Sequence, residues 1–262
     1  MVHAWGAYAG DCGELPPADA LNPRGRWEYL PLWDLLNEVG GFDGGATWWT
    51  EDFPRKVAAK ATDHQVAGRA QALVAQMAAP GRPWLWKDPA LCHFLGFWRQ
   101  FWDAPVFVVM VRHPVDLAVS WNQFRRADGL QEVSLTCNLL RWQHMMLSVL
   151  HAMEPEPVTL FAEYEAMAAD PTGQARRLAA FLDRQCATAS GHDTVARMAR
   201  ACVPAYRRNR GGQLREDLMT PAQRALYRFL RQKVQQPQAP ATEEFPMPAG
   251  WRELVIGEEG IT

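Results

Sequence analysis

A short run of apolar residues, followed by a polar turn and a helical pattern, organises the middle of the chain. Residues 106–111 are six consecutive apolar residues, mostly β-branched. Such a run is typical of a strand that is buried on both faces in a parallel sheet. Arg112 and His113 interrupt it, and Pro114 favours the first turn of a helix, where its missing N–H would be unpaired anyway. Because residues 115–126 contain no helix breaker, we predict a strand, a sharp turn and a helix.

The same alternation of short apolar runs and helical stretches continues elsewhere. Residues 84–86 and 158–161 predict two more strands. Helices are predicted over residues 29–37, 53–79, 91–102, 134–153, 172–182 and 220–233. The alternation favours an α/β fold with three parallel strands joined by right-handed crossovers. We expect one α/β domain over residues 1–233 and a partly disordered C-terminal tail over residues 234–262, which is rich in Pro and Gln at its start.

Composition and charge narrow the function classes. A chain of 262 residues is long enough for one well-packed domain. The net charge of −2 gives no case for nucleic-acid binding. No apolar run approaches the roughly 20 residues of a membrane span, and the N-terminus lacks the pattern of a signal peptide. The five cysteines are scattered without a C-x-x-C pair, which favours reduced thiols in a cytoplasm and no bound metal.

The polar turn after residues 106–111 is a candidate ligand site. In open α/β sheets, ligands collect at the carboxyl ends of strands, beside helix N-termini. Arg112 stands at this point, and Ser120 follows two helical turns later, on the face that also carries Asp116 and Phe124. An arginine and a hydroxyl in this arrangement suit a doubly charged phosphate. Alternatively, Arg112 caps a neighbouring helix and Ser120 is an ordinary helix serine.

The segment V-R-H-P-V-D-L-A-V-S, residues 111–120, resembles the 3′-phosphate-binding segment of a known enzyme family. This family is the sulfotransferases that use 3′-phosphoadenosine 5′-phosphosulfate (PAPS), and further matches from about Trp5 to Leu230 resemble its bacterial branch. The resemblance implies a three-layer, P-loop NTPase-like parallel sheet flanked by helices. It also implies that Arg112 and Ser120 bind the 3′-phosphate.

The pattern P-P…N-P-x-G-x-W-E, residues 16–28, resembles a segment that faces the active site in bacterial sulfotransferases. The resemblance implies that Glu28 is a general base, and a carboxylate half-shielded by Trp27 is suited to take a proton near neutral pH. The residues alone leave a second interpretation open, in which Glu28 stands at a helix start and is favoured there by the helix dipole.

The pattern W-x-W-K-D-P, residues 84–89, resembles the second strand and turn of the same family. The resemblance implies that Lys87 stabilises charge on the transferring sulfuryl group or on the bridging oxygen. The alternative is a salt bridge between Lys87 and Asp88 or another carboxylate. Ala90 stands where many family members have an arginine, so one charge contact is absent.

Two later segments resemble nucleotide-binding parts of the family. The strand over residues 158–161 leads into Glu163-Tyr164-Glu165, which resembles the family's Tyr-Glu-Asp segment, with Ala166 where Asp often stands. The resemblance implies that Tyr164 approaches the adenine, and a structural hydrogen bond is the alternative. Residues 203–213 resemble a late loop that closes on the nucleotide. The donors of this loop would be Arg207, Arg208 and Arg210, although a solvated basic turn would have the same composition.

The glycine-rich loop that holds the 5′-phosphosulfate in this family has no match. No G-x-x-x-x-G-K-[ST] segment occurs, and residues 6–10 contain no basic residue. By the resemblance, the chain begins within the helix that would follow the first strand and its loop. Three explanations are open: a misplaced start or a fragment, a strand supplied by another polypeptide, or a degenerate relative without transferase activity.

The main functional hypothesis is a sulfotransferase that moves a sulfuryl group from PAPS to a hydroxyl or amine of a small-molecule or carbohydrate acceptor, without a metal. The alternative is a degenerate, catalytically inactive sulfotransferase-like domain that acts as a binding or interaction module. A P-loop kinase would need a Walker lysine and Mg²⁺ carboxylates, which we cannot place. Trp27, Trp48 and Trp49 permit a carbohydrate or aromatic acceptor and require neither.

Overall fold

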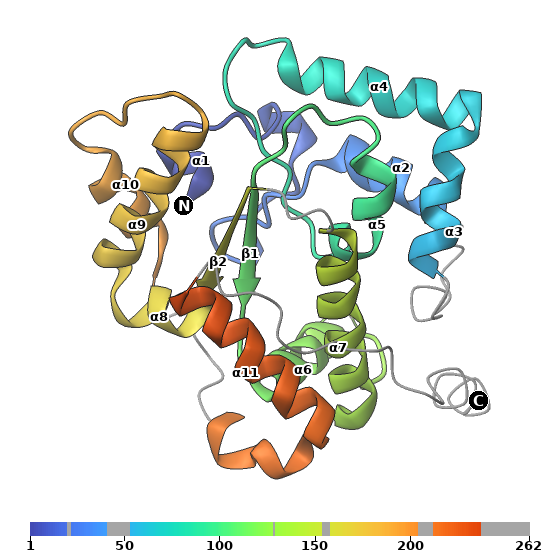
Figure 1. Ribbon diagram of the computed structural model, residues 1–262, viewed down its shortest axis with the longest axis vertical. Helices are drawn as coiled ribbons and strands as arrows, with labels where there is room; N and C mark the ends of the chain where they lie inside the picture. The colour runs from blue at the N-terminus through green and yellow to red at the C-terminus, as the bar shows by residue number, and fades with distance from the viewer. Residues whose placement is uncertain (20–21, 41–52, 128, 154–157, 204–211, 237–262) are drawn as a thin grey trace. The chain divides into compact units, whose positions relative to one another are not determined.

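The computed structural model describes residues 1–19, 22–40, 53–127, 129–153, 158–203 and 212–236, without the side chains of residues 212–214. The chain divides into two compact units. Unit 1 comprises Met1–Trp5, Val106–His144 and Pro155–Pro248, and unit 2 comprises Gly6–Pro105, Met145–Glu154 and Ala249–Thr262. The described residues are mostly helical and contain one small parallel sheet (Figure 1), so the α/β class is confirmed.

The sheet of unit 1 consists of β1 (Phe107–Val111) and β2 (Thr159–Glu163), which run parallel. Their register places Phe107 opposite Thr159 and Val111 opposite Glu163. Between them the chain passes through α6 (Pro114–Ala127) and α7 (Leu135–Ala152), and the part of α7 beyond His144 belongs to unit 2. Both strands and the helix after β1 therefore confirm the prediction. Because the two strands end in register, the residues that follow them leave the sheet at the same edge.

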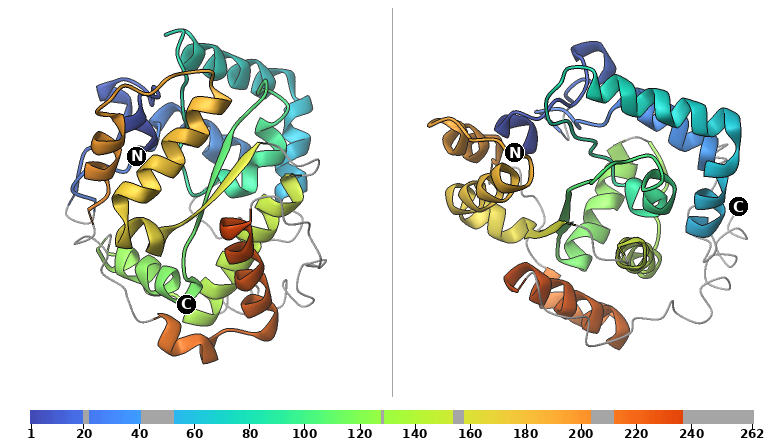
Figure 2. Two further views of the ribbon diagram at one scale, coloured as in Figure 1. Left: turned by 60° about the vertical axis from the view of Figure 1, so that its left-hand side comes forward. Right: turned by 45° about the horizontal axis from the view of Figure 1, so that its top comes forward.

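The remaining helices of unit 1 follow β2, apart from the short N-terminal one. They are α1 (Val2–Trp5), α8 (Tyr164–Ala169), α9 (Pro171–Gln185), α10 (Thr194–Ala201), the 3₁₀ segment η5 (Gly212–Leu218) and α11 (Pro221–Gln235). Asp170 starts α9 by accepting a hydrogen bond from the Gly173 N–H at 2.9 Å. Thr220 and Gln223 form a capping box at the start of α11. Helix α9 packs against α10 (Figure 2), and α10 was not predicted.

Helix α11 packs on both strands of the sheet. Arg177 of α9 fixes the C-terminal end of α11, since its guanidinium donates to the Phe161 carbonyl of β2 at 3.3 Å and to the Val234 carbonyl at 2.7 Å. Burial lowers the pKa of Arg177, and two buried carbonyl acceptors offset part of that cost. The C-terminus of α11 is thereby tied to the strand that leads to Tyr164.

Unit 2 is built from helices around an apolar core. The helices are η1 (Cys12–Glu14), α2 (Leu30–Gly40), α3 (Phe53–Ala59), η3 (Lys60–Thr62), α4 (His64–Ala78) and α5 (Leu91–Trp98). Leu32, Leu35 and Leu36 recur on one face of α2, as an amphipathic helix requires, and pack with Phe94 and Trp98 of α5. The core thus joins α2 and α5, the two helices that follow Glu28 and Lys87 in the chain.

The prediction of a single helix over residues 53–79 is wrong, because Asp63 interrupts the helical conformation. Asp63 is extended (φ −73°, ψ 118°), and its carboxylate accepts from the N–H groups of Gln65 and Val66. Aspartate is among the preferred N-cap residues, so it starts a new helix as readily as it interrupts an old one. Two helices separated by a short 3₁₀ segment replace the predicted one.

The strand predicted over residues 84–86 is also wrong. Only Trp84 pairs, through an isolated parallel bridge to Tyr8, in which the Tyr8 N–H donates to the Pro83 carbonyl and the Leu85 N–H donates to the Tyr8 carbonyl. Gly10, two residues after Tyr8, has φ +108°, and a Cβ there would lie 2.6 Å from Cδ2 of Tyr29. The described sheet therefore has two strands instead of three. The assignment of residues 1–233 to one domain stays a prediction, and residues 237–262 lie outside the described residues.

Candidate functional site

The turn after β1 holds the first candidate site, which we call the Arg112 turn (residues 111–114). The Arg112 guanidinium lies over the Tyr164 ring, 4.6 Å from its centre. This contact follows from the strand register, because Val111 pairs with Glu163. Arg112 follows Val111 and Tyr164 follows Glu163, so both leave the sheet at the same place. A cation over an aromatic face is attracted by the ring and keeps its planar group oriented. Two residues predicted as nucleotide ligands are thus brought together.

Four buried polar atoms of Arg112, His113 and Glu165 have no hydrogen-bond partner among the described residues, and two of them are Nδ1 and Nε2 of His113. The other two are Nε of Arg112 and Oε2 of Glu165. Buried polar groups are nearly always paired in folded proteins. A donor and an acceptor left unpaired at the carboxyl edge of the sheet are therefore suited to a polar ligand.

His113 is buried and anchors the Arg112 turn through contacts with Glu165 and helix α11. His113 is 1% exposed, and its backbone N–H donates to Oε1 of Glu165 at 3.3 Å. The imidazole meets the Tyr227 ring edge-on, with 5.0 Å between ring centres, and its Nε2 lies 3.7 Å from Oε1 of Glu216. Sequence reasoning noted His113 only as an interruption of the apolar run. The only sequence feature that pointed to a structural role for His113 was its position directly after the predicted buried strand.

Helix α11 contacts the ends of both strands. Tyr227 packs on His113 after β1, whereas Arg231 forms an ion pair of 3.0 Å with Glu163, the last residue of β2. Burial, together with the nearby Glu165 carboxylate, raises the pKa of Tyr227, so its hydroxyl stays protonated. Sequence analysis predicted this helix but gave it no role at the site. The amphipathic pattern of α11 indicates that one face of the helix is buried, but it does not identify the residues that this face contacts.

Ser120 lies in α6, six residues after Pro114, which is about 9 Å along the helix axis. Its side chain is partly buried. Joint binding of one phosphate by Arg112 and Ser120 stays a prediction. Arg207, Arg208 and Arg210 lie outside the described residues, as do Trp48 and Trp49.

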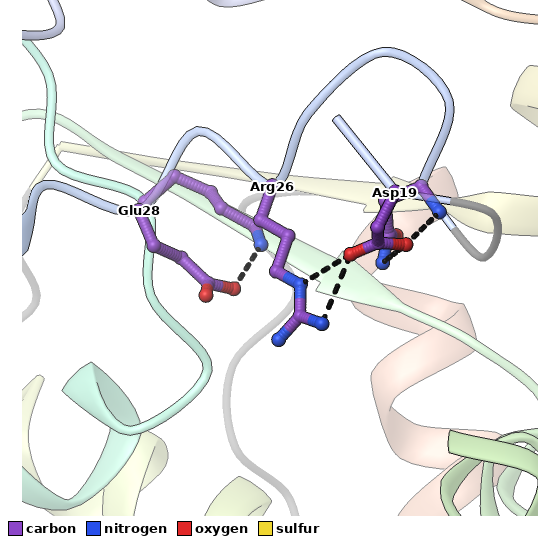
Figure 3. A network of polar contacts seen from close by, with 5 residues as sticks. Asp19, Arg26 and Glu28 are labelled. Carbon is purple, nitrogen blue, oxygen red and sulfur yellow. Dashed lines mark hydrogen bonds and ion pairs between the residues drawn. The ribbon is translucent and has the colours of Figure 1, made fainter. Parts of the chain in front are cut away.

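The second candidate site is in unit 2, and we call it the Glu28–Lys87 pair. Nζ of Lys87 lies 2.8 Å from Oε1 of Glu28 (Figure 3). The structure thus joins the predicted base to the predicted sulfuryl-stabilising cation across 59 residues of sequence. Helix α2 begins at Leu30, so Glu28 precedes it and its carboxylate turns to Lys87. The sequence did not decide which carboxylate pairs with Lys87, and in the structure this partner is Glu28.

Asp88 adds a second carboxyl group beside this pair. It accepts a hydrogen bond from the Ala90 N–H at 2.6 Å, next to the start of α5. Burial and, more weakly, repulsion from Glu28 raise the pKa of Asp88 to about 6. Its protonation therefore changes in the range in which a general base would work, although sequence analysis treated it only as a partner for Lys87.

The comparison with known families agrees with this chemistry. A sequence model described as the sulfotransferase family matches residues 37–188, which is more than half of the chain. The chain therefore belongs to the sulfotransferase family. The match includes Lys87, Arg112, Ser120 and Tyr164, whereas Glu28 precedes it. No curated protein and no solved structure matches the chain significantly.

Two further observations concern the described part of the chain. No helix in it is long and apolar enough to cross a bilayer. Nor do its histidine, cysteine, aspartate and glutamate side chains form a group of three or more that could hold a metal ion. The prediction that the protein uses no metal stays a prediction.

Proposed function

We propose that the protein transfers a sulfuryl group from PAPS to a hydroxyl or amine of a small-molecule or carbohydrate acceptor, in a cytoplasm and without a metal. The fold we propose is the P-loop NTPase-like fold of PAPS enzymes. Membership of the sulfotransferase family supports the reaction class. The observation that carries the proposal is the Glu28–Lys87 pair, since its 2.8 Å contact keeps a carboxylate base and a cation within reach of the same small group.

The pair divides the work of an in-line displacement. Glu28 takes the proton of the acceptor as the acceptor oxygen or nitrogen forms its bond to sulfur. The bond between sulfur and the bridging oxygen breaks, and its electrons leave with 3′-phosphoadenosine 5′-phosphate (PAP). Lys87 offsets the negative charge that develops on the sulfuryl or bridging oxygens. As in phosphoryl transfer, positioning and electrostatics supply most of the rate.

The Arg112 turn supplies nucleotide binding in this proposal. Arg112 and Ser120 bind the 3′-phosphate, and Tyr164 lies beside the adenine. Arg207, Arg208 and Arg210 close on the nucleotide. Support comes from the buried, unpaired Nε of Arg112 and from the Tyr164 ring that holds its guanidinium. Arginine suits a phosphate because its planar fork can donate two parallel hydrogen bonds.

The first test is calorimetric titration of the purified chain with PAP and with adenosine 5′-phosphate, which lacks the 3′-phosphate. We expect PAP to bind at least tenfold more tightly, as one or two charge-assisted hydrogen bonds provide. Equal affinities would exclude Arg112 and Ser120 as 3′-phosphate ligands. The second test is transfer of label from radiolabelled PAPS to acceptors. Tight PAP binding without transfer to any acceptor would instead favour the catalytically inactive binding module.

A further inference from the structure

Glu165 has one carboxylate oxygen in use and one without a partner. Oε1 accepts a hydrogen bond from the His113 backbone N–H at 3.3 Å. Oε2 is buried and has no hydrogen-bond partner among the described residues. A carboxylate oxygen can only accept hydrogen bonds, and leaving a buried acceptor without a donor is costly. Oε2 is therefore suited to a ligand group that donates a hydrogen bond.

This oxygen lies beside the Arg112 turn. Glu165 contacts His113, the residue after Arg112. It also follows Tyr164, whose ring centre lies 4.6 Å from Cζ of Arg112. Nε of Arg112 is likewise buried and has no hydrogen-bond partner in the described part of the chain. A cationic donor and an anionic acceptor thus stand at one edge of the sheet, and a ligand that carries an anionic group next to a hydrogen-bond donor would satisfy both.

The nucleotide of the proposed function carries such a pair of groups. Because the phosphates of PAP are largely ionised at neutral pH, its hydrogen-bond donors are the ribose 2′-hydroxyl and the adenine 6-amino group. The 2′-hydroxyl is on the carbon next to the one that bears the 3′-phosphate, whereas the 6-amino group is on the side of the base remote from the ribose. When Arg112 binds the 3′-phosphate, the 2′-hydroxyl is the donor nearer to the Arg112 turn.

We propose that Glu165 recognises the ribose 2′-hydroxyl of the nucleotide, with Oε2 accepting its hydrogen bond while Arg112 binds the neighbouring 3′-phosphate. This inference rests on the proposed function and adds to it a residue that determines nucleotide specificity. No bond forms or breaks at the 2′ position, so Glu165 acts on binding and not on the transfer step.

A carboxylate at this position makes two kinds of nucleotide bind poorly. A 2′-deoxy nucleotide leaves Oε2 buried and unpaired, and sites built to bind a hydroxyl reject analogues that lack it for this reason. A nucleotide with its phosphate at the 2′ position places two negative charges side by side, which costs more in a partly buried site than in water. Glu165 thereby favours a ribonucleotide that carries its phosphate at the 3′ position.

The experiment measures the affinities of four nucleotides for the full chain by calorimetry. They are PAP, 2′-deoxyadenosine 3′,5′-bisphosphate (2′-deoxy-PAP), adenosine 2′,5′-bisphosphate, and inosine 3′,5′-bisphosphate, which has an oxygen in place of the 6-amino group. Glu165→Ala removes the acceptor, and Glu165→Gln keeps an uncharged one. Glu216→Gln is the matched control, because the Glu216 carboxylate also lies near His113, 3.7 Å from its Nε2, but its side chain is 49% exposed. Tm is measured for every variant.

We expect the natural chain to bind 2′-deoxy-PAP about tenfold more weakly than PAP, the effect of losing one hydrogen bond to a charged group. In Glu165→Ala the two affinities should agree to within about twofold, whereas Glu216→Gln should keep the ratio of the natural chain. Glu165→Gln should keep part of this ratio. It should also narrow the gap between PAP and adenosine 2′,5′-bisphosphate by about tenfold, since the repulsion is gone.

A purely structural role of Glu165 would give a different result. Loss of its contact with the His113 N–H would weaken PAP and 2′-deoxy-PAP equally, so the preference for PAP would persist in Glu165→Ala and overturn the inference. Should Glu165→Ala fail to fold, an unchanged gap to adenosine 2′,5′-bisphosphate in Glu165→Gln would overturn it.

The remaining outcomes separate this inference from the proposed function. Equal affinities of the natural chain for PAP and 2′-deoxy-PAP would overturn the inference alone and leave PAP binding standing. A preference for PAP over the inosine nucleotide that disappears in Glu165→Ala, without a change in the 2′-deoxy ratio, would assign the carboxylate to the 6-amino group and overturn the 2′ assignment. Failure of the natural chain to bind PAP would overturn the proposed function itself.

Discussion

The Arg112 turn and the Glu28–Lys87 pair differ in how their charges are satisfied. Arg112 is held over the Tyr164 ring and keeps a buried Nε without a hydrogen-bond partner among the described residues. Lys87 and Glu28 neutralise each other at 2.8 Å, and the Lys87 side chain is half exposed. An exposed ion pair contributes about 0.2–1 kcal/mol, so a substrate can replace either partner at small cost. The first region is suited to holding a ligand, and the second to exchanging partners during a reaction.

The supports of the two regions differ in the same way. The Arg112 turn is secured by buried groups, since His113 is 1% exposed and Tyr227 is 5% exposed. The Glu28–Lys87 pair belongs to segments without regular structure, between Arg26 and the start of α2 and between Trp84 and the start of α5. Loops on a rigid scaffold commonly carry residues that act on a substrate. Substitutions in the Arg112 turn should therefore change nucleotide affinity, whereas substitutions in the Glu28–Lys87 pair should change the rate of transfer.

The largest expected effect is that of Glu28→Gln. The amide keeps the shape of the side chain but cannot take a proton, so kcat should fall by about 10²–10⁴-fold. PAP affinity should not change. Rates of transfer from radiolabelled PAPS test this, with Asp34→Asn as the control, because Asp34 is an exposed acidic residue on α2. Undiminished turnover would exclude Glu28 as the base.

Arg112→Gln should act on binding. Loss of a charge-assisted contact of about 1.5–3 kcal/mol predicts a 10- to 100-fold weaker affinity for PAP. The affinity for adenosine 5′-phosphate should stay nearly constant, since that nucleotide lacks the group that Arg112 binds. Calorimetry measures both, and Arg126→Gln on the exposed side of α6 serves as the control. An equal loss for both nucleotides would contradict the 3′-phosphate assignment.

Asp88→Asn should stabilise the fold at neutral pH. The pKa of Asp88 rises from 3.8 to about 6 on folding, so between these values the folded chain keeps a proton that the unfolded chain has lost. As the pH rises through this window, the free energy of unfolding falls. The amide removes the penalty, which is about 1–2 kcal/mol after allowance for partial exposure.

Thermal unfolding at pH 7.5 and at pH 4.5 measures this effect. The Tm of Asp88→Asn should exceed that of the natural chain by a few degrees at pH 7.5, and the difference should shrink at pH 4.5. A gain that does not depend on pH would mean that burial of the charge is not its cause.

The smallest expected effect comes from Arg231→Gln. Loss of the ion pair with Glu163 should weaken PAP binding about twofold to threefold, because the β2 end that precedes Tyr164 loses one of its contacts with α11. A double-mutant cycle with Glu163→Gln should give a coupling energy of about 0.2–1 kcal/mol in unfolding. Additive effects on both stability and PAP affinity would show that α11 does not position this strand end.

Several predictions from the sequence were confirmed because their information is local. The strand at residues 106–111 and the following helix match β1 and α6 to within one residue at each end. The strand predicted over residues 158–161 corresponds to β2, which begins one residue later and ends two residues later. The failures at residues 53–79 and 84–86 have causes that hydrophobic periodicity does not report. Asp63 caps a new helix, and Trp84 pairs only through one isolated bridge to Tyr8.

The sequence by itself determined the α/β class, the strand–turn–helix around Arg112 and the chemical types of the candidate residues. Contiguous residues carry this information in their apolar periods and turn signals. Only the tertiary structure decided that Glu28 pairs with Lys87, that Arg112 lies over Tyr164 and that α11 contacts the ends of both strands. These contacts join residues far apart in the chain. Packing and strand register determine them, and no local pattern encodes which distant side chain will be the partner.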